Sequence, residues 1–302
     1  MSIYPMHPKI PLLKSRLKAA WQLLRSCRLC PRQCAVNRIH EEHGYCGEGL
    51  LPGVASDNLH YGEEPPISGV QGSGTIFFTG CTMRCVYCQN YPISHMGHGE
   101  RIPIPSLAKK MLQLQSRGAH NINLVTPTHF IPQILTALYI AYKEGLTIPI
   151  VYNTSGYETV DALKLLDGIV DIYLPDMKYS DKIIAKKYSD VTNYPAINQA
   201  AVLEMFRQVG HLKQDSRGIA KKGLIIRHLI LPGWIPGTKN VLQWIAGHIG
   251  TETYISLMNQ YFPVYKATKI PALNQPISKA MFKSAQRSLL KLGFKNGWWQ
   301  DA

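Results

Sequence analysis

Three cysteines, Cys81, Cys85 and Cys88, lie in segment 79–90 with three and two residues between them. Three thiolates can bind three irons of a cubane [4Fe-4S] cluster and leave the fourth iron open, whereas a closed cluster takes four cysteines. An open position also distinguishes a catalytic zinc site from a structural one. Zinc binding and chance spacing are the alternatives. The spacing, with the aromatic Tyr87 just before the last cysteine, favours the cluster.

The other four cysteines form a second group at the N-terminal side of the first: Cys27, Cys30, Cys34 and Cys46. Four thiolates with no vacancy are typical of a structural zinc site. A second iron–sulfur cluster and reduced free thiols are the alternatives. Disulfides would need an oxidising compartment, and no export signal is visible. Residues 27–74 are rich in Gly, Pro and Cys, so we expect an irregular segment that a bound metal orders.

Short apolar runs alternate with longer amphipathic ones from residue 75 onward. The predicted strands are 75–79, 122–125, 148–153, 170–174, 224–229 and 254–258. The predicted helices are 12–25, 106–117, 132–144, 159–166, 181–188 or 195–209, 238–249 and 278–292. This alternation favours a parallel sheet. The expected fold class is α/β, a partial (β/α)6 TIM-like barrel with an N-terminal Cys-rich metal-binding segment.

We expect three parts along the chain: an N-terminal helix and Cys-rich segment over 1–70, the barrel over 71–270, and a helical extension over 271–302. Polar residues stand at or just after the carboxyl ends of the predicted strands: Cys81, Thr126, Ser155, Asp176 and Asn259. Barrels of this type place their chemistry at that end of the strands. The fold should therefore bring these residues together around the three-cysteine loop.

The three-cysteine segment resembles the signature of the radical S-adenosylmethionine (SAM) superfamily. Residues 74–81, with Gln89 and Asn90, resemble the branch of pyruvate formate-lyase activating enzyme-like proteins, and the resemblance extends over roughly residues 20 to 270. It implies that the amine and carboxylate of SAM chelate the open iron. An electron from the cluster would split the sulfonium into methionine and a 5′-deoxyadenosyl radical, which takes a hydrogen atom from the substrate. The protein would orient the cofactor.

The resemblance also implies SAM contacts at the strand ends. Segment 125–129 stands where the family carries a Gly-Gly-Glu-type segment but contains no acid, and Asn153 replaces an acid of the family. Asp176 and Lys178 match the family's Asp-x-Lys pattern, and Arg227 would bind a carboxylate with two hydrogen bonds. The expected cofactor contacts are Tyr87, Thr126, Thr128, His129, Asn153, Ser155, Asp176, Lys178, Arg227 and Asn259. A helix-capping strand end, a turn and a surface ion pair are the alternatives.

The chain of 302 residues has 33 Lys and Arg against 19 Asp and Glu, a formal net charge of +14. This charge favours an anionic partner, and a generally basic surface is the alternative. No apolar run reaches the ~18 residues that span a bilayer, so we expect a cytoplasmic protein with no membrane partner.

The resemblance implies an enzyme that installs a glycyl radical on a protein partner and takes electrons from a flavodoxin or ferredoxin. The activating enzyme of pyruvate formate-lyase itself lacks the four-cysteine segment. The second hypothesis is a radical enzyme that modifies RNA or a small molecule, although the sequence has no RNA-binding motif. The third is a non-enzymatic electron-transfer or metal-binding protein, which the open-iron spacing disfavours.

Overall fold

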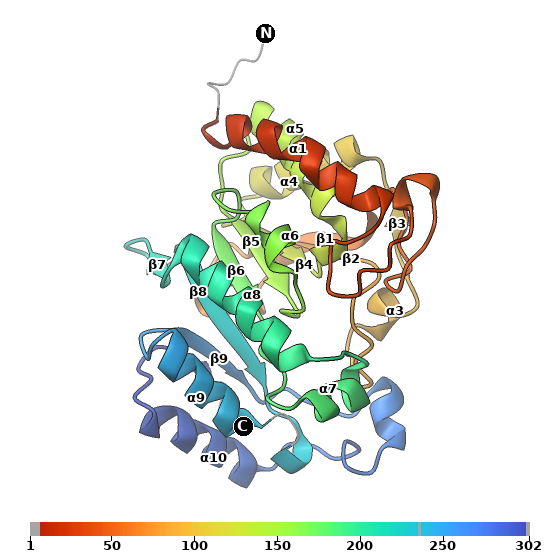
Figure 1. The fold of residues 1–302 in the computed structure, drawn as a ribbon. Coiled ribbons are helices and arrows are strands. Elements are labelled where there is room, and N and C mark those ends of the chain that lie inside the picture. The colour runs from red at the N-terminus through yellow and green to blue at the C-terminus, as the bar shows by residue number, and fades with distance from the viewer. Residues whose placement is uncertain (1–6, 235–236, 300–302) are drawn as a thin grey trace.

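The computed structural model describes residues 7–234 and 237–299, which form an α/β fold around a mostly parallel sheet (Figure 1). The strands are β1 (Gly53–His60), β2 (Ser73–Phe78), β3 (Glu100–Arg101), β4 (Ile122–Val125), β5 (Ile150–Thr154), β6 (Ile172–Pro175), β7 (Lys213–Gln214), β8 (Ala220–Leu229), β9 (Tyr254–Met258) and β10 (Gly297–Trp299). Their order across the sheet is β10-β9-β8-β6-β5-β4-β2-β1-β3, and β7 pairs with β8 outside this path.

All six predicted strands form, and they lie side by side in parallel as β2, β4, β5, β6, β8 and β9. Their apolar residues are buried because helices cover one face of the sheet, as the alternating pattern predicts. The sheet does not close, since β3 and β10 stand at its two edges. The arrangement is consistent with a partial TIM-like barrel.

The prediction that residues 27–74 are irregular is wrong in part. The segment contains β1, which pairs antiparallel with β2, and the short helix α2 (Pro65–Ser68). Strand β1 was not predicted because its residues, including Ser56, Asp57 and Asn58, are largely polar. The strand forms because β2 offers a free edge to pair with. The short β10 adds a further parallel strand to β9 that was also not predicted.

The helices follow the predicted ranges closely, and both of the alternatives near 181–188 and 195–209 form. The α-helices after the ones already named are α1 (Lys9–Arg25), α3 (Tyr91–Ser94), α4 (Ile104–Ser116), α5 (Ile131–Lys143), α6 (Val160–Lys164), α7 (Lys182–Ser189), α8 (Tyr194–Val209), α9 (Thr238–His248) and α10 (Lys279–Lys291). The 3-10 turns are η1 (Arg38–His40), η2 (Thr128–Phe130), η3 (Pro232–Trp234) and η4 (Tyr265–Lys269).

Helices cover the outer face of the sheet in three groups, of which α8 packs against α6 and α7 over β6 and β8. Helix α5 packs against both α1 and α4, and α9 packs against α10 near the other edge (Figure 1). Apolar side chains repeat along each helix at the spacing that faces the sheet, for example Leu107 and Met111 of α4, which are fully buried. In the part of the chain that the structure describes, no helix is long and apolar enough to cross a membrane.

The inner face of the sheet is apolar at the amino ends of the strands. Ile67 of α2 packs there among Val151, Ile172, Leu174 and Ile225. Successive side chains of a strand alternate between faces, so the residues two positions further along share the inner face. Those residues are polar: Asn153, Asp176 and Arg227. The fold thus seals the amino-end half of the inner face with α2 and leaves polar groups toward the carboxyl ends.

Candidate functional site

The three-cysteine loop follows β2 through Gly80, whose backbone φ of +70° suits glycine. A Cβ atom there would lie 2.7 Å from the carbonyl oxygen of Cys46, so the turn also needs glycine for space. Each loop sulfur has a hydrogen-bond partner: Cys81 Sγ lies 3.4 Å from the Met83 amide, Cys85 Sγ 3.1 Å from the Ser189 hydroxyl, and Cys88 Sγ 3.2 Å from the Ser94 hydroxyl. Hydrogen bonds to the sulfurs are one means by which proteins tune iron–sulfur clusters.

Tyr87 belongs to a buried chain of hydroxyl groups behind the loop. Its phenol lies 2.6 Å from that of Tyr179, which lies 2.7 Å from the Ser189 hydroxyl, and Ser189 in turn donates to Cys85 Sγ. Tyr87, Tyr179 and Ser189 are all buried. The chain of hydroxyls fixes the position of Cys85. Ser189 therefore supports the loop. It was not predicted because it lies on α7, far along the chain from the three cysteines.

The three thiols lie close enough to influence one another. Burial first, and then the neighbouring Cys85 and Cys88, raise the pKa of Cys81 to about 12. Because metal ligands must be thiolates, cluster binding would release protons here. Three adjacent thiols, of which Cys81 and Cys85 accept hydrogen bonds from Met83 and Ser189, fit a cluster that, when bound, supplies the electron and the open iron for SAM cleavage.

Among residues 7–234 and 237–299, no group of three or more His, Cys, Asp or Glu side chains is arranged to hold a metal ion. Ligands of a single ion must converge on one point. The thiolates of a cubane instead bind three separate irons and need not converge. The arrangement of Cys81, Cys85 and Cys88 is therefore compatible with a cluster, and the choice of metal for the four N-terminal cysteines stays a prediction.

Asp176 lies just beyond β6 and joins two basic side chains in a buried ion-pair network. Its carboxylate accepts from Lys178 Nζ at 2.6 Å and from Arg227 Nε at 2.9 Å. Burial alone would raise the pKa of Asp176, but Arg227 and Lys178 outweigh it and hold this pKa below its usual value. Asp176 is only 7% exposed, so the network is not a surface ion pair. It places three charged groups at the carboxyl ends of β6 and β8.

The ends of β5 and β6 are held together by side chains of α8. The Tyr194 hydroxyl donates to the carbonyl oxygens of Ser155 and Asp176 at 2.8 and 3.1 Å. Asn198 donates to the Asp176 carbonyl at 2.9 Å. Asn153 is buried on the inner face of β5. These contacts fix the backbone of two segments that the sequence analysis assigned to the cofactor.

Segment 126–129 after β4 is held mainly by buried contacts. Thr126 has a left-handed φ of 59° and is partly buried. The Thr128 hydroxyl donates to Glu158 at 2.6 Å, and His129 Nε2 donates to the Thr79 carbonyl at 2.7 Å. Burial and the nearby Arg38 lower the pKa of His129 to about 3, so its ring is neutral. The side chains of Thr128 and His129 are thus engaged within the protein.

Asn259 follows β9, at the same end of the sheet as the other predicted contacts. The structure therefore places each of the ten predicted SAM contacts at, or one loop beyond, the carboxyl end of a parallel strand. Their binding of SAM stays a prediction. Three acids with largely buried side chains were not predicted, because isolated Glu residues carry no sequence pattern: Glu63, Glu64 and Glu158.

The N-terminal cysteines also lie near one another. Cys27 and Cys30 are buried, and Cys34 and Cys46 are partly buried. Burial raises the pKa of Cys30, and the other three thiols raise it further. The segment is docked against the rest of the protein by Arg38, a fully buried side chain whose guanidinium donates to the Gly49 carbonyl at 2.8 Å and to the His129 carbonyl at 2.6 Å.

A direct contact joins this segment to the three-cysteine loop. Arg84 donates to the Tyr45 carbonyl at 2.6 Å and to the Cys81 carbonyl at 2.7 Å. Arg32 lies over the Tyr45 ring, 3.6 Å from its centroid, and donates to the Thr82 carbonyl at 2.9 Å. The expectation that only a metal could order this segment is therefore incomplete, since buried arginine contacts also hold it.

The fold and the cysteine loop together define a class of iron–sulfur α/β protein with its chemistry at the carboxyl ends of parallel strands. The family model for the radical SAM superfamily matches residues 75–237. The chain is 31% identical over 278 residues to the uncharacterized protein MJ0674 of Methanocaldococcus jannaschii, covering 88% of this chain and 75% of that protein. It is 22% identical over 268 residues to MJ0808 of the same organism, covering 81% and 73%.

Two solved structures are similar to part of the chain. TYW1 with a lysine-pyruvate adduct bound has a TM-score of 0.45 at 11% identity, covering 72% of this chain and 73% of that one. HydG, a maturase of the [FeFe]-hydrogenase, has a TM-score of 0.46 at 14% identity, covering 71% and 47%. Similarity this weak adds nothing to the assignment. The family match and the first relative show that the chain belongs to the radical SAM superfamily.

Membership implies an enzyme that cleaves SAM to a radical at an iron–sulfur cluster. The non-enzymatic hypothesis is therefore not supported.

Proposed function

We propose that this radical SAM enzyme abstracts a hydrogen atom from a glycine of a partner protein and so activates a glycyl radical enzyme. The observation that carries the proposal is the three-cysteine loop with its flanking residues 74–80 and Gln89-Asn90, which resemble the activating-enzyme branch. The open edge of the sheet supports it, because a polypeptide loop needs an entrance that a closed barrel lacks.

The chain's own residues would bind and orient the cofactor. Cys81, Cys85 and Cys88 would hold the cluster, with the sulfurs of Cys81 and Cys85 accepting from the Met83 amide and the Ser189 hydroxyl. Asp176, Lys178 and Arg227 are the charged candidates for the amine and carboxylate of SAM, since each offers a charge-assisted hydrogen bond. The remaining predicted contacts would supply polar atoms around them: Tyr87, Thr126, Thr128, His129, Asn153, Ser155 and Asn259.

An electron donor such as flavodoxin or ferredoxin would dock beside the cysteine loop. A surface depression there is lined by Arg84, Lys187, Lys266 and His95, with Asp190 as its one acid among the lining residues. Most of these groups are basic, and complementary charge speeds the encounter with an acidic partner. We place this exchange in the cytoplasm, where such donors occur.

The four N-terminal cysteines would hold a structural zinc ion, with a second iron–sulfur cluster as the alternative. The support is the number and spacing of these cysteines in the sequence, because the described side chains would have to draw together to bind one ion. Arg32 of this segment donates to the Thr82 carbonyl, and Arg84 of the three-cysteine loop donates to the Tyr45 carbonyl. These contacts suit a supporting role for the N-terminal segment.

Modification of RNA is the second candidate, and one observation favours it: the formal net charge of +14. The two functions separate in a single experiment. The reconstituted protein, reductant and SAM are incubated with a candidate glycyl radical enzyme from the same cell or with total RNA. An electron paramagnetic resonance doublet from the candidate glycyl radical enzyme supports glycyl activation. A modified nucleoside in the RNA, with no such doublet, supports the alternative.

A further inference from the structure

A cavity of about 360 Å³ opens at the β9–β10 edge of the sheet, between the strands and the loop that follows β1. The lining residues that matter here are Tyr61, Glu63, Glu64, Arg227, Trp298 and Trp299. Arg227 belongs to both this cavity and the ion-pair network of Asp176. The cavity therefore reaches from the open edge to the charged groups at the strand ends.

Carboxylates outnumber cations around Arg227. Three acids, Asp176, Glu63 and Glu64, act on its guanidinium. Arg227 contacts Asp176 at 2.9 Å and stands 3.8 Å from Glu63, while Lys178 contacts Asp176. With all five groups ionised, the network carries one negative charge that no cation in it offsets. Burial raises the pKa of Glu63 to about 7, with Arg227 acting in the opposite direction.

Glu64 is the acid without a hydrogen-bonded partner at one oxygen. The residue is only 8% exposed, and its Oε2 atom is buried with no partner. A buried carboxylate oxygen in this state is costly unless a donor meets it. The carbonyl of Glu64 accepts from the amides of Ile67 and Ser68 at 2.8 and 3.1 Å, so the backbone that carries the carboxylate is fixed in place by α2.

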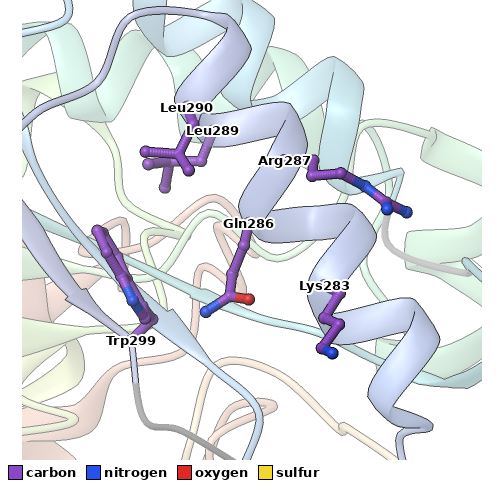
Figure 2. Close-up of a pocket in the computed structure, with 6 residues that line it drawn as sticks. All are labelled: Lys283, Gln286, Arg287, Leu289, Leu290 and Trp299. Carbon is purple, nitrogen blue, oxygen red and sulfur yellow. The ribbon is translucent and has the colours of Figure 1, made fainter.

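Aromatic rings stand over the cavity beside these acids. Trp298 stacks on Tyr254 with ring centroids 5.3 Å apart, which fixes part of the cavity wall, and Tyr61 and Trp299 also line the cavity. Aromatic faces attract cations and accommodate the apolar stem of a long side chain. The pocket in Figure 2 adjoins this region through Trp299 but is lined by Lys283, Gln286 and Arg287, and no lining residue there is a buried acid.

We propose that this cavity binds the cationic end of the substrate, an alkylammonium or alkylguanidinium group whose charge meets Glu64 and whose stem lies between Trp298 and Tyr61. This deepens the proposed function and rests on it, because the group would be a Lys or Arg side chain near the target residue of the partner polypeptide. Nothing in the four-cysteine or electron-donor regions is needed for it.

Saturation-transfer NMR on the cluster-loaded protein at pH 8 tests the proposal, since Glu63 is then mainly ionised. The probes are n-butylguanidinium, n-butylammonium and the neutral n-butanol. We expect saturable binding of the two cations and not of the alcohol. Glu64→Gln should weaken cation binding about tenfold, the effect of one charge-assisted hydrogen bond. The control Glu252→Gln, at a side chain that is 81% exposed, should bind as the wild type does.

Tyr61→Leu provides a second variant whose folding is not at risk, because Tyr61 is 62% exposed. It should weaken cation binding about threefold through the lost ring face. A blocked Gly-Arg-Gly peptide is a further probe. Binding tighter than that of butylguanidinium supports a polypeptide side chain as the ligand, whereas equal binding would overturn that assignment in favour of a small-molecule cation. Equal signals from butanol and the cations, or unchanged binding in Glu64→Gln, would overturn the proposal. No reductant is present, so the result is independent of SAM cleavage.

Discussion

Glu158 offers a quantitative test of how the loop after β4 is held. Its side chain is fully buried and accepts from the Thr128 hydroxyl at 2.6 Å, from the Thr154 hydroxyl, and from the Tyr152 hydroxyl at 3.4 Å. Burial raises the pKa of Glu158 from 4.5 to about 7, although the three hydroxyl donors act against this shift. Ionisation of the buried carboxylate therefore lowers the free energy of unfolding.

Proton linkage determines whether Glu158 raises or lowers the free energy of unfolding as the pH rises. The native state binds the Glu158 proton more tightly than the unfolded state, so this group lowers the free energy of unfolding as pH rises from about 4.5 to about 7. Each pKa unit corresponds to about 1.4 kcal/mol, which gives about 3 kcal/mol across the window. Glu158→Gln keeps an oxygen that accepts from Thr128 and Thr154, and its amide can donate to the Tyr152 oxygen.

The assay is urea unfolding of the wild type and of Glu158→Gln between pH 4 and pH 8. We expect the variant to gain about 3 kcal/mol relative to the wild type over this range, with most of the gain between pH 4.5 and 7. Glu204→Gln is the matched control, because Arg207 lowers the pKa of Glu204 and the variant should lose stability above pH 4.5. A stability difference between wild type and Glu158→Gln that stays constant with pH would refute the reasoning.

Two further changes test the cofactor site and the N-terminal segment. Arg227→Ala and Asp176→Ala should each weaken SAM binding by about 1.5–3 kcal/mol with unchanged iron content, because each removes a charge-assisted hydrogen bond; unaltered calorimetric affinity in both variants would exclude them as contacts. Double substitution of Cys27 and Cys30 by Ser should expose the N-terminal segment to proteolysis, while the iron bound at Cys81, Cys85 and Cys88 persists. Elemental analysis of the wild type should give about one zinc beside about four irons, and about eight irons without zinc would replace the zinc with a second cluster.

The parallel core of the fold could be predicted because its signals are local. Each of the six strands is a short apolar run, and each helix between them repeats its apolar residues at helical spacing. Strand β1 could not be predicted in this way. Its order comes from pairing with β2 and from the docking of its segment by Arg38, and neither contact leaves a local pattern.

The site residues with a local sequence pattern could likewise be predicted, and those without one could not. The cysteine spacing predicts the metal ligands, and the position of Asp176 just after a strand places it at the strand end where it contacts Arg227, 51 residues away. The supporting groups could not be predicted because each is a single residue from a distant segment. Ser189 contacts Cys85, Glu158 contacts Thr128, and Glu64 lines the cavity at the open edge of the sheet.

The measurement that tests the central claim most directly is release of 5′-deoxyadenosine by anaerobically reconstituted protein with SAM and a reductant. We predict release by the wild type and by Met96→Ala, a substitution of an exposed side chain that follows the loop. We predict none from Cys85→Ala, because two thiolates cannot hold three irons of a cluster with one open site. Full cleavage activity in Cys85→Ala would contradict the account.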